Sequence, residues 1–287
     1  MLDDYSGLLA QELRDLWPLA SKIAGSTNGR LMGGTALALH LRHRSSTDID
    51  IMTLETFDGR EARTLVEQHL RAEHPEDYWQ IQQVLEVRKN GYSATINGVR
   101  FDVFRALGSG EAQAAEMQWL QDPVDVEGMP VGSVPDILSA KLAAALDRSK
   151  LRDFVDLAAI DLRGGYSLED GLEFYRRTYG LDKNPNPEAI RRILKTLADP
   201  EYIEPDREFD SQRQNTLDHL RARSGELQDY LAAIIDQRVL PAATDRLEDL
   251  GAPRPAASPN RCGRWMPRAR VHCGLPANHK GPHRRNR

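Results

Sequence analysis

Alternating apolar and polar positions mark the first part of the chain as rich in strands. A strand presents every second residue to the same face, so a half-buried strand shows this period of two. Asn-Gly pairs at 90–91 and 97–98 are typical of two-residue hairpin turns. The segments that fit a strand are 47–53, 78–88, 91–96, 99–105 and a short piece over 124–131.

Apolar residues at helical spacing dominate the rest of the chain. An amphipathic helix is predicted over 5–24, a strand, turn and helix over 29–42, and a further helix from Asp58 to about 72. From residue 134 onward the predicted helices are 134–147, 151–163, 167–178, 186–198, 211–223 and 226–248.

These patterns predict an α+β protein of two lobes. An α/β lobe with a mixed sheet is predicted over 1–130, a helical lobe over 131–250, and a basic tail over 251–287. A chain of 287 residues is long enough to bury a core in each lobe.

A glycine pair, Gly33-Gly34, follows the apolar end of a short predicted strand. Glycine permits a tight turn and a close approach of phosphate to the backbone, and the free N–H groups of the next helix attract an anion. Thr35 is positioned to cap or begin that helix. A glycine pair alone equally fits an ordinary strand-turn-helix corner.

Two carboxylates, Asp48 and Asp50, share one face of a predicted strand because side chains alternate along it. Adjacent carboxylates repel each other unless a cation lies between them, and hard oxygen ligands suit Mg²⁺ or Mn²⁺. Asp102 is the acid of another apolar strand, and if the two strands are neighbours it completes a two-metal site. Without a metal, all three acids are solvated residues of strand ends and edges.

Lys141 interrupts the apolar stripe of the predicted helix 134–147, and Asp156 lies in the next predicted helix. A lysine in such a stripe ordinarily extends its ammonium group to water. The functional alternative is that Lys141 binds a triphosphate as a point charge while Asp156 orients it across the helical hairpin.

Four separated motifs resemble, in order, the AbiEii family of nucleotidyltransferases, which includes the MenT-type toxins of mycobacteria within the DNA polymerase β-like superfamily. The resemblance covers roughly residues 28 to 165 and supports only a helical continuation beyond them. The motifs are Gly33-Gly34-Thr35-Ala36-Leu37, Arg44-Ser45-Ser46-Thr47-Asp48-Ile49-Asp50, Gly98-Val99-Arg100-Phe101-Asp102-Val103, and Lys141 with Arg152-Asp153-Phe154-Val155-Asp156-Leu157.

The resemblance implies a polymerase β-like nucleotidyltransferase lobe followed by a helical lobe, acting as the toxin of a type IV toxin–antitoxin pair. It implies an NTP as substrate and the 3′ acceptor end of tRNA as acceptor, whose modification blocks aminoacylation and stops translation. Mg²⁺ or Mn²⁺ is the expected cofactor, and a cognate antitoxin is the expected protein partner.

The resemblance also assigns roles to residues. Ser46 is a candidate site of regulatory phosphorylation, because a phosphate there would add about two negative charges beside two carboxylates. The alternative is that its hydroxyl merely caps a turn. The catalytic set carried over by motif is Ser46, Asp48, Lys141 and Asp156, to which the residue chemistry adds Asp50 and Asp102. The expected nucleotide-binding residues are Gly33, Gly34, Thr35, Ser46 and Lys141.

Charge is distributed unevenly along the chain. Residues 251–287 contain nine Lys and Arg and no Asp or Glu, so removing them from the overall charge of −5 leaves −14 for residues 1–250. An acidic body binds RNA only through a local basic cleft. The candidates near the site, which equally fit solvated surface charges, are Arg42, Arg44, Arg148, Lys150 and Arg152.

The basic tail carries cysteine and histidine residues with the spacing C-x10-C-x5-H-x3-H. Thiolates and imidazoles at such separations suit a tetrahedral Zn²⁺ site, although the tight Cys-x2-Cys pair is missing. The alternative is a disordered basic tail, and either form could contact RNA phosphates. The possible zinc ligands are Cys262, Cys273, His279 and His283, with His272 as a competitor.

The cysteines and the apolar runs bear on location. Both cysteines lie in the tail, which does not suggest a secreted disulfide scaffold. No apolar run reaches the roughly 18–20 residues that span a membrane, and the first residues lack a signal-peptide pattern. A cytoplasmic location without a membrane partner is therefore expected.

Three other functions remain open at the level of sequence. The same enzyme chemistry could act on a protein side chain or a small molecule instead of RNA. The chain could be a non-enzymatic module that binds nucleotide or RNA, or a glycosyltransferase that uses Asp48 and Asp50 to bind a nucleotide-sugar. The Gly-Gly-Thr turn and Lys141 are not expected in a glycosyltransferase.

Overall fold

The computed structural model describes residues 2–106, 117–148, 150–179, 187–198, 203–204 and 207–235. Contacts divide the chain into two compact units, Met1–Pro255 and Ala256–Arg287, and the described residues all belong to the first. The expected boundary near residue 130 stays a prediction. The four possible zinc ligands lie outside the described residues.

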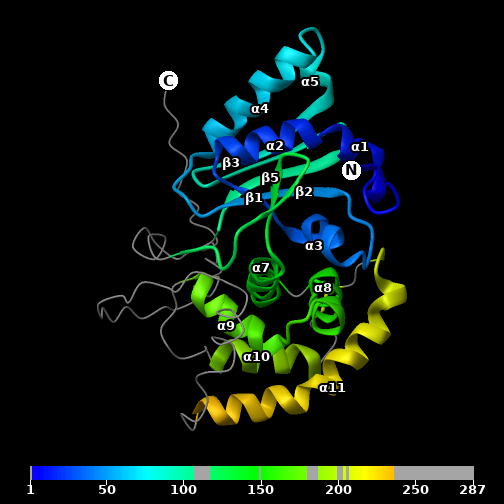
Figure 1. Cartoon of the computed structure of the whole chain (residues 1–287), viewed down its shortest axis with the longest axis vertical. Coiled ribbons are helices and arrows are strands. Elements are labelled where there is room, and N and C mark those ends of the chain that lie inside the picture. Colours follow the sequence, from blue (N-terminus) through cyan, green and yellow to red (C-terminus); the bar gives the residue numbers. More distant parts are fainter. Residues whose placement is uncertain are drawn as a thin grey trace, which may run out of the picture. The chain divides into compact units, whose positions relative to one another are not determined.

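A seven-stranded mixed sheet lies at the centre of the first unit, with the strand order β3-β4-β5-β2-β1-β7-β6 (Figure 1). β2 pairs in parallel with β5, and β1 pairs in parallel with β7, whereas the other neighbours are antiparallel. The strands are β1 (Arg30–Leu31), β2 (Asp48–Thr53), β3 (Gln82–Arg88), β4 (Gly91–Ile96), β5 (Val99–Arg105), β6 (Val124–Val126) and β7 (Met129–Val131).

Two hairpin turns have consecutive positive φ angles, whereas the turn predicted at Asn90-Gly91 is shifted by one residue, because Gly91 already pairs with Arg88 as the first residue of β4. Asn97 and Gly98 both have positive φ angles, 49° and 80°, and connect β4 to β5. Glu127 and Gly128, at 50° and 81°, connect β6 to β7 in the same way. Two consecutive positive φ angles match the twist of the flanking strands, which is why such turns fix the strand register.

Helices cover the two faces of the sheet differently (Figure 1). α2 (Trp17–Ser26) and α4 (Gly59–Glu73) pack on one face, where they contact β2, β4 and β7. The fully buried Ile49 and Ile51 alternate along β2 with Asp48 and Asp50, so the two carboxylates point to the opposite face. α3 (Gly33–Leu41) lies on that opposite face and reaches α7 and α8.

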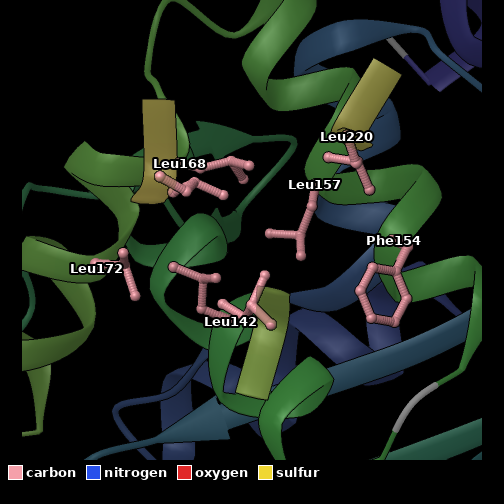
Figure 2. Close-up of a pocket in the computed structure, with 8 residues that line it drawn as sticks. Leu142, Phe154, Leu157, Leu168, Leu172 and Leu220 are labelled. Carbon is pink, nitrogen blue, oxygen red and sulfur yellow. The ribbon is translucent and has the colours of Figure 1, made fainter. Parts of the chain in front are cut away.

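The chain after the sheet forms a set of packed helices. They enclose a small pocket whose lining is entirely apolar, with leucine side chains from α7, α8, α9 and α11 pointing toward one another (Figure 2). In the part of the chain that is described, no helix has both the length and the apolar character needed to cross a membrane. The helices are α7 (Val134–Asp147), α8 (Leu151–Arg163), α9 (Leu168–Thr178), α10 (Pro187–Ala198) and α11 (Asp210–Ile235).

Side-chain caps account for the sharp starts of several helices. Asp58, Ser133 and Ser167 each accept a hydrogen bond from a backbone N–H of the first turn, and Ser167 forms a complete capping box with Asp170. The helices predicted over 134–147 and 151–163 are confirmed with the same bounds.

Three predicted elements differ from the structure. The helix predicted over 5–24 is divided into a 3₁₀ turn (Leu2–Tyr5), α1 (Gln11–Asp15) and α2, because Pro18 fits only the first turn of a helix. The strand predicted over 78–88 begins as the short helix α5 (Tyr78–Ile81) and becomes a strand only at Gln82.

The break predicted between residues 223 and 226 is wrong, because α11 continues through it. Leu220 and Leu227 are both buried on either side of Gly225. A glycine in a helix costs about 1 kcal/mol relative to alanine, and burial of these leucines offsets that cost.

Phe101 offers a test of the sheet core, because it is fully buried in β5, an interior strand of the sheet. We expect Phe101→Ala to lower the free energy of unfolding by about 3–5 kcal/mol, through lost burial and the cavity that remains. Leu162→Ala is the matched control, since Leu162 is 62 % exposed and its loss should change stability by less than about 0.5 kcal/mol. Urea unfolding of both variants measures the difference; equal losses would contradict this core.

Candidate active site

Two parallel strands bring three acidic side chains onto one face of the sheet. Asp50 of β2 lies directly opposite Asp102 of β5 in the strand register, and Asp48 lies opposite Arg100. Residues two apart on a strand point the same way, so Asp48, Asp50, Arg100 and Asp102 share this face. The structure therefore brings together three acids from two distant segments, since Asp48 and Asp102 are 54 residues apart in the sequence.

Neighbouring groups hold two of these acids. Asp102 accepts hydrogen bonds from the Ser93 hydroxyl and from Nε of Arg100, the latter at 2.8 Å. Asp48 forms an ion pair with Arg152, whose Nη1 lies 3.5 Å from Oδ2. Both arginines remain partly exposed, so water screens each ion pair and weakens it relative to a buried one.

Asp50 has a strongly perturbed ionisation. Burial among protein atoms, and then the negative charge of Asp102, raise the pKa of Asp50 to about 6. The positive charges of Lys141 and Arg148 oppose this rise, so both cations lie within electrostatic reach of Asp50. The site therefore places two mutually repelling acids, Asp50 and Asp102, near two cations that act on Asp50.

The acids fit a divalent cation by their chemistry. Carboxylate oxygens are the ligands that Mg²⁺ prefers, and a cation would relieve the repulsion between Asp50 and Asp102. Among the described residues, however, no group of three or more His, Cys, Asp or Glu side chains is arranged to hold a metal ion as it stands. Because Arg100 and Arg152 engage Asp102 and Asp48, a metal would have to displace these arginines.

The glycine turn contacts the same acids. Gly33 has a φ angle of +70°, and a Cβ built there would overlap Oδ2 of Asp50 and lie 3.0 Å from its Cγ. A side chain at this position therefore cannot coexist with the present Asp50 carboxylate. The turn is bound to the acidic face by close packing.

Thr35 has a different role from the predicted one. The helix begins at Gly33 without a side-chain cap, so the expectation that Thr35 caps or begins it is wrong. The Thr35 hydroxyl instead bonds to the Asp48 carbonyl oxygen and to the Ser46 hydroxyl, the latter at 2.8 Å. Ser46 is buried, and its backbone N–H donates to the Leu8 carbonyl.

Lys141 lies in a buried cluster of charges between α7 and α8. Its ammonium group is 2.6 Å from Asp156 Oδ2 and 3.1 Å from Asp153 Oδ1, and its side chain is 8 % exposed. Burial alone would lower the pKa of Lys141, but the ion pairs with Asp156 and Asp153 outweigh it and raise the pKa. Arg148 binds the other oxygen of Asp153 at 3.1 Å.

Asp156 is bound by three donors at once. Besides Lys141, Arg44 holds both of its oxygens, at 2.7 Å and 3.0 Å, and Nε2 of His43 lies 2.8 Å from Oδ1. Burial alone would raise the pKa of Asp156, but Lys141, His43 and Arg44 together hold it well below its usual range. Asp156 is thus ionised throughout the range of physiological pH.

Besides Thr35, Arg44 lies in a different environment from the expected one, and other residues of the site were not expected. Arg44 was expected either in a basic cleft for RNA or as a solvated surface charge, but its side chain is 9 % exposed and bound to Asp156, so it is not a solvated surface charge. His43, Arg100 and Ser93 were not predicted to belong to the site. The position of Arg100 two residues before Asp102 on a strand is a signal that could have identified it, whereas nothing in the sequence links Ser93 to Asp102.

Comparison with known protein families decides the assignment. A family model described as "Nucleotidyl transferase AbiEii toxin, Type IV TA system" matches residues 20–237. The chain belongs to this family. AbiEii membership makes it a nucleotidyltransferase toxin of the type IV class, and an NTP substrate and an antitoxin partner follow from that class. No curated protein matches the chain.

Two solved structures are similar to parts of this AbiEii-family protein. MenT4, a nucleotidyltransferase toxin from Mycobacterium tuberculosis, is 15 % identical with a TM-score of 0.37, over 75 % of this chain and 89 % of that one. ANT(2″)-Ia in complex with adenylyl-2″-tobramycin is 22 % identical with a TM-score of 0.31, over 46 % of this chain and 76 % of that one.

The raised pKa of Asp50 gives a pH-dependent stability. Because the carboxyl pKa is about 6 in the folded protein against 3.8 in the reference state, the folded form loses stability as the pH rises from about 4 to 6. We expect metal-free Asp50→Asn to be more stable than the wild type at pH 7.5. The gain should be roughly 1–2 kcal/mol, reduced by water around the carboxylate, and should vanish below about pH 4.

Urea unfolding in EDTA across this pH range measures the effect. Asp77→Asn is the matched control, because the Asp77 side chain is exposed, at 52 %. An Asp50→Asn variant that is less stable than the wild type at pH 7.5 would contradict the repulsion between Asp50 and Asp102.

Proposed function

We propose that this AbiEii-family protein transfers a nucleoside monophosphate from an NTP to RNA, with the 3′ acceptor end of tRNA as the acceptor. In this reaction the acceptor 3′-oxygen bonds to the α-phosphorus, the bond from that phosphorus to the bridging oxygen breaks, and pyrophosphate leaves. Addition of nucleotides to that end would block aminoacylation and inhibit translation. Both the acceptor and a cytoplasmic location remain predictions.

One observation carries the proposal: Asp50 lies opposite Asp102 in the strand register and within electrostatic reach of Lys141. Nucleotidyl transfer requires acids for metal and hydroxyl beside a cation for phosphate, and this face of the sheet offers both. The apolar pocket between the helices offers neither, since leucines and other apolar residues line it.

Asp48, Asp50 and Asp102 would hold Mg²⁺ or Mn²⁺ in this proposal. A bound metal supplies charge neutralisation for the triphosphate and for the departing pyrophosphate. Asp102 would assist removal of the proton from the attacking hydroxyl. The raised pKa of Asp50 supports this role, since a carboxyl group with a pKa of about 6 readily takes up either a proton or a cation.

Lys141 would neutralise the triphosphate, with Asp156 orienting it, as their 2.6 Å ion pair supports. Because Asp153 and Asp156 already engage the ammonium group, triphosphate binding would exchange one acidic partner for phosphate. The nucleotide would lie against residues near the turn and the acidic strand, namely Gly33, Gly34, Thr35 and Ser46.

Ser46 is proposed as a regulatory position beside the catalytic acids. Its hydroxyl is buried and hydrogen-bonded to Thr35. A phosphate at Ser46 would place about two negative charges next to Asp48 and would disrupt this bond. Modification would therefore require local opening of the segment before β2.

Removal of one acid tests the catalytic assignment. We expect Asp48→Ala to reduce transfer of labelled nucleotide by about 100-fold or more, since even outer-shell changes at metal sites cost 10–100-fold. The assay incubates the protein with each labelled NTP and a mixed pool of RNA, protein and small molecules. Asp77→Ala, which removes an exposed acid, should retain activity. Full activity of folded Asp48→Ala would refute the assignment.

The same pool identifies the acceptor. Label in RNA, followed by sequencing of RNA 3′ ends from cells that express the chain, should locate added nucleotides at the tRNA acceptor end. Label in protein or in small molecules instead would replace the RNA proposal by transfer to those acceptors.

Metal dependence is a separate prediction. We expect EDTA to abolish pyrophosphate release, and added Mg²⁺ or Mn²⁺ to restore it, because the acids need a cation to bind a triphosphate. Mn²⁺ binding followed by electron paramagnetic resonance should weaken in Asp50→Asn. Undiminished activity in EDTA would show that the acids act without a metal.

A further inference from the structure

Arg44 is a buried arginine that connects the glycine turn to the helical hairpin. Its guanidinium group binds both oxygens of Asp156, through Nε at 2.7 Å and Nη2 at 3.0 Å. The same group donates through Nη1 to the Ser45 carbonyl and lies 5.0 Å from the Phe209 ring centroid. Such a two-point contact fixes orientation as well as distance, which a lysine cannot do.

Arg44 and Lys141 share one acceptor atom. Lys141 Nζ lies 2.6 Å from Oδ2 of Asp156, the oxygen that also accepts from Nη2 of Arg44. Rotation of the Asp156 carboxylate would therefore move the acceptor away from Lys141. By holding both oxygens, Arg44 prevents that rotation.

The second glycine of the turn lies against this guanidinium group. A Cβ built on Gly34 would overlap Nη2 of Arg44 and would lie 3.0 Å from Cζ and 3.2 Å from Nη1. Gly34 has an ordinary negative φ angle, so backbone strain does not demand glycine there. The demand comes from Arg44, because its Nη2, the atom bonded to Asp156 Oδ2, would have to shift to make room.

We propose that Arg44 is a positioning residue for Lys141, acting through Asp156, and that Gly34 is required because it admits Arg44. This inference rests on the proposed role of Lys141 in triphosphate binding. It separates the two glycines: Gly33 makes room for the Asp50 carboxylate, and Gly34 makes room for a cation. A side chain at position 34 would then affect nucleotide binding through Arg44, whether or not the Gly34 backbone also touches the nucleotide.

A double-mutant cycle tests the proposal, with the wild type, Gly34→Ala, Arg44→Ala and the double variant. We expect Gly34→Ala and Arg44→Ala each to raise the KM for NTP about 10–100-fold, the effect of losing one charged hydrogen bond, with kcat changed far less. In the Arg44→Ala background, Gly34→Ala should add less than about threefold, because contacting residues are not additive. Arg44→Lys should recover only part of the loss, since lysine makes a single contact.

Urea unfolding of the same four proteins gives a readout that does not depend on activity. Gly34→Ala should lower the urea concentration at the unfolding midpoint when Arg44 is present. The same substitution should lower it little in the Arg44→Ala background. Arg63→Ala is the matched control, because Arg63 is 49 % exposed in a surface pair with Glu67 and should leave KM unchanged.

The outcomes separate this inference from the proposed function. Equal effects of Gly34→Ala in both backgrounds, in KM and in unfolding, would overturn it and favour direct approach of phosphate to Gly34. Coupled unfolding with an unchanged KM would overturn the positioning role. A wild type that transfers nucleotide from none of ATP, CTP, GTP and UTP would refute the proposed function, while the unfolding cycle would still decide whether Gly34 serves Arg44.

Discussion

The buried carboxylate of Asp156 is the point on which the arrangement of the site depends. It is fully buried, and three side chains from two other parts of the chain, His43, Arg44 and Lys141, converge on it. A charge in such a position is stable only when its hydrogen bonds are complete, and loss of one partner typically costs about 3–5 kcal/mol. The network therefore joins the segment after α3 to the hairpin of α7 and α8 in one geometry.

The acidic face of the sheet follows the opposite principle. Parallel pairing of β2 and β5 places Asp50 against Asp102, where like charges repel. The partly exposed Arg100 pairs with Asp102, and Lys141 and Arg148 offset part of the repulsion at Asp50. Arg100 and Arg152 are arranged around the acids as exchangeable counter-ions. The two regions differ physically, because a satisfied buried network preserves geometry, whereas an incompletely neutralised acidic pair favours a new cation.

The glycine turn contacts both the acidic face of the sheet and the buried network around Asp156. Gly33 approaches the Asp50 carboxylate and Gly34 approaches the Arg44 guanidinium group, so consecutive residues contact opposite charges. Thr35 then ties the helix to β2 and to Ser46. Membership of the AbiEii family gives this local arrangement a chemical context, that of nucleotidyl transfer.

The sequence by itself determined the elements and the facing of the acids. Helix bounds for α7 and α8 followed from the apolar spacing, and the shared face of Asp48 and Asp50 followed from strand geometry, because both are local properties of the chain. Only the tertiary structure decided that Asp102 lies opposite Asp50, that Arg44 is buried on Asp156, and that α11 continues through Gly225. These depend on pairing and burial between residues far apart in the chain, whose energies exceed local preferences and leave no periodic pattern in the sequence.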